Sequence, residues 1–84
     1  VKAAVAFAKK KGDVLVVVCA DHETGGVSVE GTTKSSLKIS FSTGGHTATL
    51  VPVFAYGPGS KAFAGPHDNT EVPSLIAKAL GLSF

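Results

Sequence analysis

Apolar positions recur with a helical period at both ends of the chain. Residues 1–11 place apolar side chains on one face and end in three consecutive lysines, which complement the negative end of a helix dipole. A glycine follows and provides the C-cap. Residues 70–80 form the second predicted helix, with Asn69 or Thr70 as its N-cap and a glycine after its last turn.

Between these helices the pattern changes to that of strands. Residues 14–19 form a continuous apolar, mostly β-branched run, which is typical of a strand buried on both faces. Alternating stretches predict strands near 27–30 and 37–41, and another strand is expected over 49–56, where Pro52 favours a sheet edge or a bulge. A helix that leads into a buried strand is half of an α/β unit, so the pattern predicts the α/β class.

Length and composition restrict the chain to one domain or a piece of one. A domain of 84 residues buries only roughly 60–65% of its unfolded surface, so its own core is marginal. The chain has eight lysines, six acidic residues and no arginine, and this lack of arginine disfavours nucleic-acid binding. Cys19 is expected to pack as a small hydrophobic residue. No apolar stretch has the length or flanking charges of a membrane span or a signal peptide.

One carboxylate and two imidazoles supply the candidate chemistry. Asp21 and His22 directly follow the apolar run, where Gly25 and Gly26 bend the chain, and His46 also lies beside glycines. Adjacent side chains can reach one site only where a strand ends, and ligands in open α/β sheets gather beyond the carboxyl ends of strands. These donors suit zinc or a similar divalent ion. The residues alone leave ordinary roles in turns open for all three.

Three other polar positions have simpler interpretations. His67 lies between Gly-Pro and Asp-Asn, which favours a turn before the second helix. Glu23 either supports a metal ligand or is a solvated loop carboxylate. The lysine run 9–11 is interpreted as a solvated helix end, because no aromatic residue is interleaved with it.

Several motifs, taken in order, resemble those of bacterial alkaline phosphatases. They are Ala-Asp-His-Glu-Thr-Gly-Gly at 20–26, Thr-Gly-Gly-His-Thr at 43–47, the stretch 51–59, and Asp-Asn-Thr-Glu at 68–71. The likeness covers nearly the whole chain. It implies the C-terminal part of a three-layer α/β/α sandwich. The one local departure is Ala48, which stands where the family usually has glycine after the threonine.

This resemblance implies a phosphomonoester hydrolase that uses two zinc ions and one magnesium ion. The family residues that match Asp21 and His22 bind the zinc that also holds a serine nucleophile. The residue that matches His46 binds the second zinc, which activates water. The nucleophile, the other zinc ligands and the magnesium ligand have no match here, so no catalytic residue is assigned. Residues 1–84, which also lack an initiating methionine, are therefore expected to be a single C-terminal segment of a larger domain, inactive alone.

The resemblance also implies partners and a location. Phosphomonoesters, inorganic phosphate and the rest of the parent chain are the expected partners, a homodimer is a further option, and the location is periplasmic or extracellular. Two alternatives remain open. One is a stand-alone, noncatalytic metal- or phosphate-binding module. The other is a small interaction domain in which the histidines bind nothing and the basic helix contacts an acidic partner.

Overall fold

A computed structural model describes residues 1–83 of the chain. The described chain divides into two compact units. The first unit joins Val1–Cys19 to the chain from Val53 onward, and the second unit is Ala20–Pro52. The first unit contains one short strand pair, and the second contains two.

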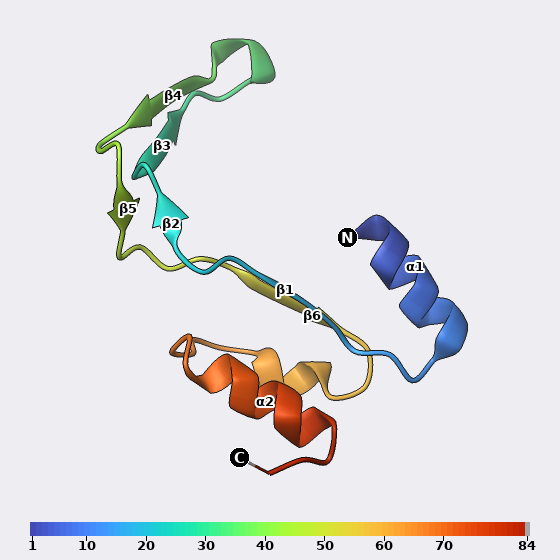
Figure 1. Cartoon of the computed structure of the whole chain (residues 1–84). Coiled ribbons are helices and arrows are strands. Elements are labelled where there is room, and N and C mark those ends of the chain that lie inside the picture. Colours follow the sequence, from blue (N-terminus) through green and yellow to red (C-terminus); the bar gives the residue numbers. More distant parts are fainter. Residues whose placement is uncertain (84) are drawn as a thin grey trace. The chain divides into compact units, whose positions relative to one another are not determined.

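The first unit is built on an antiparallel strand pair, β1 (Val16–Cys19) and β6 (Val53–Tyr56), which is preceded by helix α1 (Lys2–Lys11) (Figure 1). The register pairs the last residue of β1 with the first residue of β6. The strand predicted over 49–56 is confirmed only in its second half. It begins directly after Pro52, whose nitrogen has no hydrogen to donate to a ladder.

Helix α1 ends where the sequence predicts. Gly12 adopts the left-handed conformation with φ 82°, and its N–H donates to the Ala8 carbonyl over 2.8 Å. A left-handed residue is unfavourable for any side chain with a Cβ, so glycine is the natural residue at this stop.

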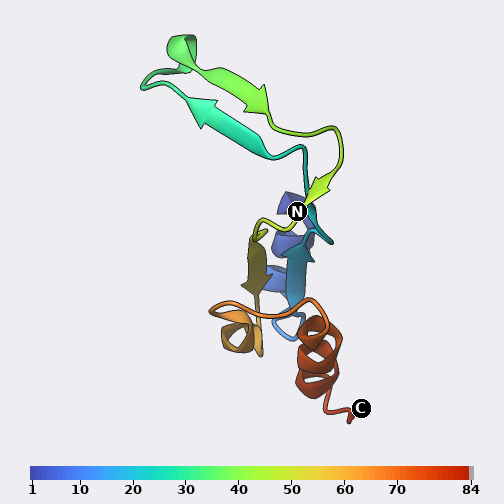
Figure 2. The same cartoon turned by 90° about the vertical axis from the view of Figure 1, so that its left-hand side faces the viewer.

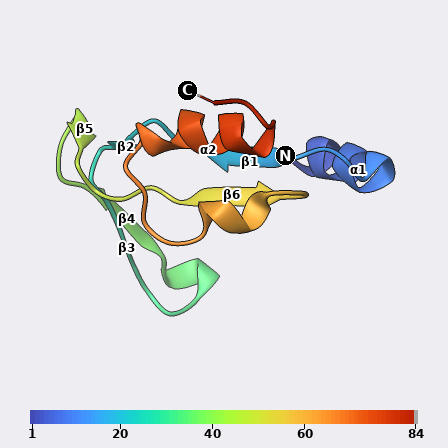
Figure 3. The ribbon, with the colours of Figure 1, turned by 90° about the horizontal axis from the view of Figure 1, so that it is seen from below.

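Two further helices complete the first unit. The short 3₁₀ helix η2 (Ser60–Phe63) follows β6 and lies against it (Figure 3), and η2 also contacts helix α2 (Glu71–Ala79). The predicted second helix is thus confirmed over most of 70–80, whereas the sequence did not predict η2. Three apolar side chains are buried among the described residues: Ala8, Phe63 and Ala77.

Helix α2 begins after one of the two predicted N-cap residues, but without a capping bond from its side chain. Thr70 occupies the N-cap position, but its side chain makes no capping bond. Instead the Asp68 carboxylate accepts bonds from the Thr70 N–H over 2.9 Å and from the Thr70 hydroxyl over 2.8 Å. The Glu71 carboxylate accepts from the Asp68 N–H over 2.6 Å. The polar residues before the helix therefore form a bonded turn.

The prediction that 14–19 is a strand buried on both faces is wrong for this chain. Val16, Val17 and Val18 are half-buried, and Cys19 is exposed, contrary to its expected role as a packed hydrophobic residue. The run has the composition of a central strand, but the described chain supplies it with β6 alone as a paired neighbour. One ladder leaves much of the strand uncovered.

The second unit contains two antiparallel pairs. Strands β2 (Glu23–Thr24) and β5 (His46–Thr47) form a very short ladder, and β3 (Val27–Glu30) and β4 (Lys38–Phe41) form a longer hairpin (Figure 2). A single turn of 3₁₀ helix, η1 (Lys34–Ser36), lies in the hairpin loop. The predicted strands near 27–30 and 37–41 are confirmed.

The β3–β4 hairpin has one apolar face. Its register pairs Val27 with Phe41 and Val29 with Ile39, so these four side chains share a face. They are 48% to 69% exposed, which leaves an apolar strip open on this unit. The mixture of helices and strands agrees with the predicted α/β class. None of the helices within residues 1–83 has the length and apolar character needed to cross a membrane.

Candidate metal centre

The β2–β5 ladder brings the two predicted histidine ligands together within the second unit. Thr24 pairs with His46 and Glu23 pairs with Thr47. The Gly25 N–H extends this pairing by donating to the Gly45 carbonyl over 2.8 Å. His22 immediately precedes β2, so the ladder register places its side chain next to that of His46.

The two glycines after β2 allow the chain to turn out of this ladder and into β3. Gly26 has φ 55°, and a Cβ at this position would overlap the Ser42 side-chain oxygen. The preceding Gly25, with φ 90°, uses its carbonyl to accept from the Ser42 N–H over 2.9 Å. Residues with side chains rarely adopt such positive φ values, so the glycine pair suits the close approach of β2 to the segment before β5.

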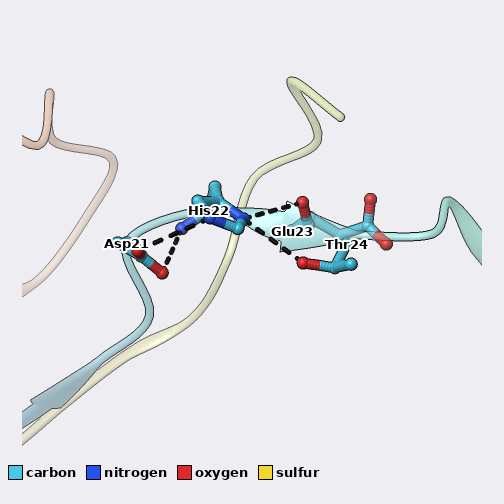
Figure 4. Close-up of polar contacts among 4 residues, drawn as sticks. All are labelled: Asp21, His22, Glu23 and Thr24. Atoms are coloured by element: carbon cyan, nitrogen blue, oxygen red, sulfur yellow. Dashed lines mark hydrogen bonds and ion pairs between the residues drawn. The ribbon is translucent and has the colours of Figure 1, made fainter. Parts of the chain in front are cut away.

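Asp21 and His22 direct metal-binding atoms toward one another. Asp21 Oδ2 lies 3.5 Å from His22 Nε2 (Figure 4), with the Asp21 side chain 87% exposed and that of His22 34% exposed. The other carboxylate oxygen, Asp21 Oδ1, accepts from the His22 backbone N–H over 3.1 Å. This local bond fixes the carboxylate beside the ring.

The second ring nitrogen of His22 makes two hydrogen bonds to the residues that follow it. His22 Nδ1 lies 3.1 Å from the Glu23 carbonyl oxygen and 3.3 Å from the Thr24 hydroxyl (Figure 4). Because a carbonyl oxygen can only accept, Nδ1 must carry the hydrogen of the neutral ring. The Nε2 lone pair is then free and faces Asp21. This tautomer is the one that a metal bound at Nε2 requires.

The rings of His22 and His46 are stacked, with centroids 3.4 Å apart and planes 23° from parallel. A metal bound to an imidazole nitrogen lies near the plane of that ring, at about 2.0–2.1 Å for zinc. The planes of the two rings are so nearly parallel that they intersect much farther from the rings than the length of a zinc–nitrogen bond. This arrangement therefore suits ligands of two neighbouring metals rather than two ligands of one metal.

The carboxylate of Glu23 accepts three hydrogen bonds and is not a free loop carboxylate. Its carboxylate accepts a hydrogen bond from the Thr47 hydroxyl, and it also accepts from the Gly26 N–H over 3.1 Å and the Val27 N–H over 3.3 Å. The Thr47 hydroxyl is the main cause that lowers the pKa of Glu23, followed by the two amides and the neighbouring His22. Glu23 therefore accepts these bonds as a carboxylate at neutral pH.

The remaining candidates lie elsewhere in the chain. His67 belongs to the first unit, where its Nε2 lies 3.0 Å from the Ala64 carbonyl, as befits the predicted turn. Among residues 1–83, no three His, Cys, Asp or Glu side chains lie close enough together to hold a metal. The described chain thus offers partial ligand sets. Sequence reasoning did not single out Thr47, because only the ladder register reveals that it lies opposite Glu23.

Comparison with known protein families gives a consistent result. The alkaline phosphatase family model matches residues 32–82. Alkaline phosphatase 3 of Bacillus subtilis is 58% identical over 40 residues, which cover 48% of this chain and 9% of that protein. Alkaline phosphatase H of Pseudomonas aeruginosa is 35% identical over an alignment of 100 positions that covers 98% of this chain and 21% of that protein.

Solved structures show the same relationship. The alkaline phosphatase from the Antarctic bacterium TAB5 is 49% identical with a TM-score of 0.85, covering 95% of this chain and 26% of that chain. A mutant of the TAB5 enzyme with Mg bound in the M3 site is 44% identical with a TM-score of 0.87, covering 99% of this chain and 27% of that chain. The chain therefore spans about a quarter of the length of these solved relatives.

Proposed function

This chain belongs to the alkaline phosphatase family, and we propose that residues 1–84 are a C-terminal segment that supplies zinc ligands for phosphomonoester hydrolysis. The family match and the α/β likeness to solved alkaline phosphatases support this assignment. The observation that carries the metal role is the pairing of Asp21 with His22 beside the stacked ring of His46.

The separation of the Asp21 and His22 donors supports one zinc position. Tetrahedral zinc with bonds of about 2.0–2.2 Å to a carboxylate oxygen and an imidazole nitrogen keeps these two atoms roughly 3.4 Å apart. Asp21 Oδ2 and His22 Nε2 are separated by 3.5 Å. The pair can therefore take up adjacent corners of one tetrahedron with little movement.

His46 would hold a second zinc. Its ring plane lies beside that of His22 at a separation similar to the roughly 3.5–4 Å between the ions of two-metal phosphatase sites. Such a pair of metals stabilises the attacking and leaving oxygens of a phosphoryl group during in-line displacement. In this scheme Asp21, His22 and His46 hold and orient the ions. The nucleophile and the remaining ligands belong to the rest of the parent chain.

A magnesium ion is also proposed for the whole enzyme, because a relative is described with Mg bound in its M3 site. No residue of this chain is assigned to it. The proposed substrates are phosphate monoesters, with inorganic phosphate as a product, in the periplasm or outside the cell. The proposed partner is the rest of the parent chain, and a homodimer is a further option. The isolated segment should be inactive.

The test uses the whole protein that carries this chain. We would measure zinc content and hydrolysis of p-nitrophenyl phosphate for the wild type, His22→Ala, His46→Ala and the control His67→Ala. The wild type should hold two zinc ions, and each of the first two variants should lose zinc together with at least about 100-fold in activity. The control should keep both metals, because His67 bonds within its own turn.

Three results would refute this proposal. Hydrolysis that survives complete metal removal would exclude the two-metal mechanism. Zinc binding by the wild type without any phosphomonoesterase activity would favour the noncatalytic metal-binding module instead. Metal content that does not respond to either histidine variant would show that these side chains are not ligands.

A further inference from the structure

We infer that Glu23 is a positioning residue that holds the His22 and His46 rings in place for metal binding, an inference that rests on the proposed function. Glu23 is not itself proposed as a ligand. It acts on the two histidines through separate atoms, its side-chain carboxylate and its main-chain carbonyl.

The carboxylate of Glu23 links the two strands that carry the histidines. It accepts from the Thr47 hydroxyl on β5, and Thr47 directly follows His46. It also accepts from the backbone amides of Gly26 and Val27, which fixes the turn after β2. The Glu23 side chain therefore links strand β2, the turn that follows it and strand β5, which contains His46.

This link is needed because the ladder is so short. Strands β2 and β5 have two residues each, and isolated two-stranded pairs are marginally stable even when they are longer. The chain beside them is rich in glycine at Gly25, Gly26, Gly44 and Gly45, which provide no side chain to hold the strands together. Besides the stacked histidine rings, the Glu23–Thr47 bond links side chains across the described part of this ladder.

The carbonyl of Glu23 sets the chemistry of the His22 ring. It accepts from His22 Nδ1 over 3.1 Å, so in the neutral ring the hydrogen lies on Nδ1, and Nε2 is the nitrogen that faces Asp21. Ring orientation through the second nitrogen is a common way in which proteins prepare a histidine ligand. Because the carboxylate fixes the backbone of Glu23, loss of the carboxylate should also loosen this carbonyl.

The experiment measures zinc affinity of the whole protein by competition with a chelator. The variants are Glu23→Ala, Glu23→Gln, Thr47→Val and the double variant Glu23→Ala/Thr47→Val. Two matched controls lie in the same unit: Glu30→Gln and Thr32→Val change the same residue types away from the metal ligands. A long-range ¹H–¹⁵N spectrum of ¹⁵N-histidine-labelled, zinc-free protein at pH 8 reports the His22 tautomer in each variant.

Glu23→Ala and Thr47→Val should each weaken zinc binding on the order of 10-fold, the scale reported for residues that orient metal ligands. The double variant should be no worse than Glu23→Ala alone, because both changes break the same link. Glu23→Gln should restore part of the affinity, since its amide oxygen can accept from both the Thr47 hydroxyl and the Gly26 N–H, while its NH₂ group loses the bond from the Val27 N–H. The controls should match the wild type.

The fraction of His22 in the Nδ1–H form should fall in Glu23→Ala and recover in Glu23→Gln. A Glu23→Gln variant as weak as Glu23→Ala would overturn the inference, because the bonds that glutamine keeps to Thr47 and Gly26 would then contribute nothing to zinc binding. Wild-type affinity in Thr47→Val would also overturn it, and this conservative change serves if Glu23→Ala does not fold. If the wild type itself does not bind zinc, the proposed function is refuted instead. The experiment therefore distinguishes failure of the proposed function from failure of this inference.

Discussion

Gly57→Ala is expected to weaken the β1–β6 ladder much more than the same substitution at Gly12. Gly57 follows β6 and has φ 109°, and a Cβ there would overlap the Val14 carbonyl oxygen. The added atom would also lie 3.1 Å from the Val14 carbonyl carbon and 3.3 Å from the Leu15 Cα. All of these atoms belong to the backbone that leads into β1, so no side-chain rotation can relieve the overlap.

The magnitude follows from two contributions. An alanine held at positive φ costs roughly 1–2 kcal/mol, and this applies to both glycines. At Gly57 the backbone next to β1 must also shift, which adds about 1–3 kcal/mol, the usual range for overpacking. Gly12 has φ 82° but nothing within 4 Å of the position of a Cβ, so it tests the first contribution alone. We therefore expect about 2–5 kcal/mol at Gly57 against about 1–2 kcal/mol at Gly12.

Amide hydrogen exchange of the whole protein, followed by mass spectrometry of peptides that contain β1 and β6, is the appropriate assay. Since 1.4 kcal/mol corresponds to a factor of ten, protection of the two strands should fall by at least about 30-fold in Gly57→Ala. Gly12→Ala should reduce it by about 5- to 30-fold, and by less than Gly57→Ala does. Equal losses in the two variants would refute the argument from steric overlap.

Two smaller effects can be measured in the same protein. Bonds from the Thr70 N–H and hydroxyl lower the pKa of Asp68, so its ionised form stabilises the fold above the ordinary aspartate pKa, and this contribution is lost as the pH falls through the lowered value. Thr70→Val should therefore raise the pKa of Asp68 in an NMR titration, and an unchanged midpoint would contradict the hydroxyl's part in the shift. Lys9 Nζ lies 5.8 Å from the centroid of the Tyr56 ring, so Lys9→Gln should lower the free energy of unfolding, measured by urea denaturation, by less than about 1 kcal/mol. Lys10→Gln is the control, and an equal loss in this variant would count against the contact.

Local patterns in the sequence were sufficient to predict most elements of the fold. The period of apolar residues and the glycine after Lys11 located helix α1 and its end, because capping depends on neighbours in sequence. Burial could not be predicted in the same way. The β-branched run of β1 indicates a central strand, yet its actual cover depends on which other strands and helices are present.

In the candidate site, too, local features could be predicted from the sequence, and features that depend on strand pairing could not. The bend after β1 predicted that Asp21 and His22 could reach a common point, and their donor atoms do face each other over 3.5 Å. The stacking of His22 on His46 depends on the register of a ladder of two residues per strand, which no periodicity reveals. The bond between Glu23 and Thr47 depends on that same register.

The pairing of Cys19 with Val53 has a consequence for how this protein can vary. The chain leaves the first unit after Cys19 and returns to it at Val53, and these two residues are partners in one ladder. Residues 20–52 therefore form a cassette with adjacent ends, and loops with adjacent ends tolerate changes of length well. The hairpin tip around Thr32 and Thr33 could accept insertions, or be exchanged between relatives, without changing the spacing of the strands that enclose the cassette.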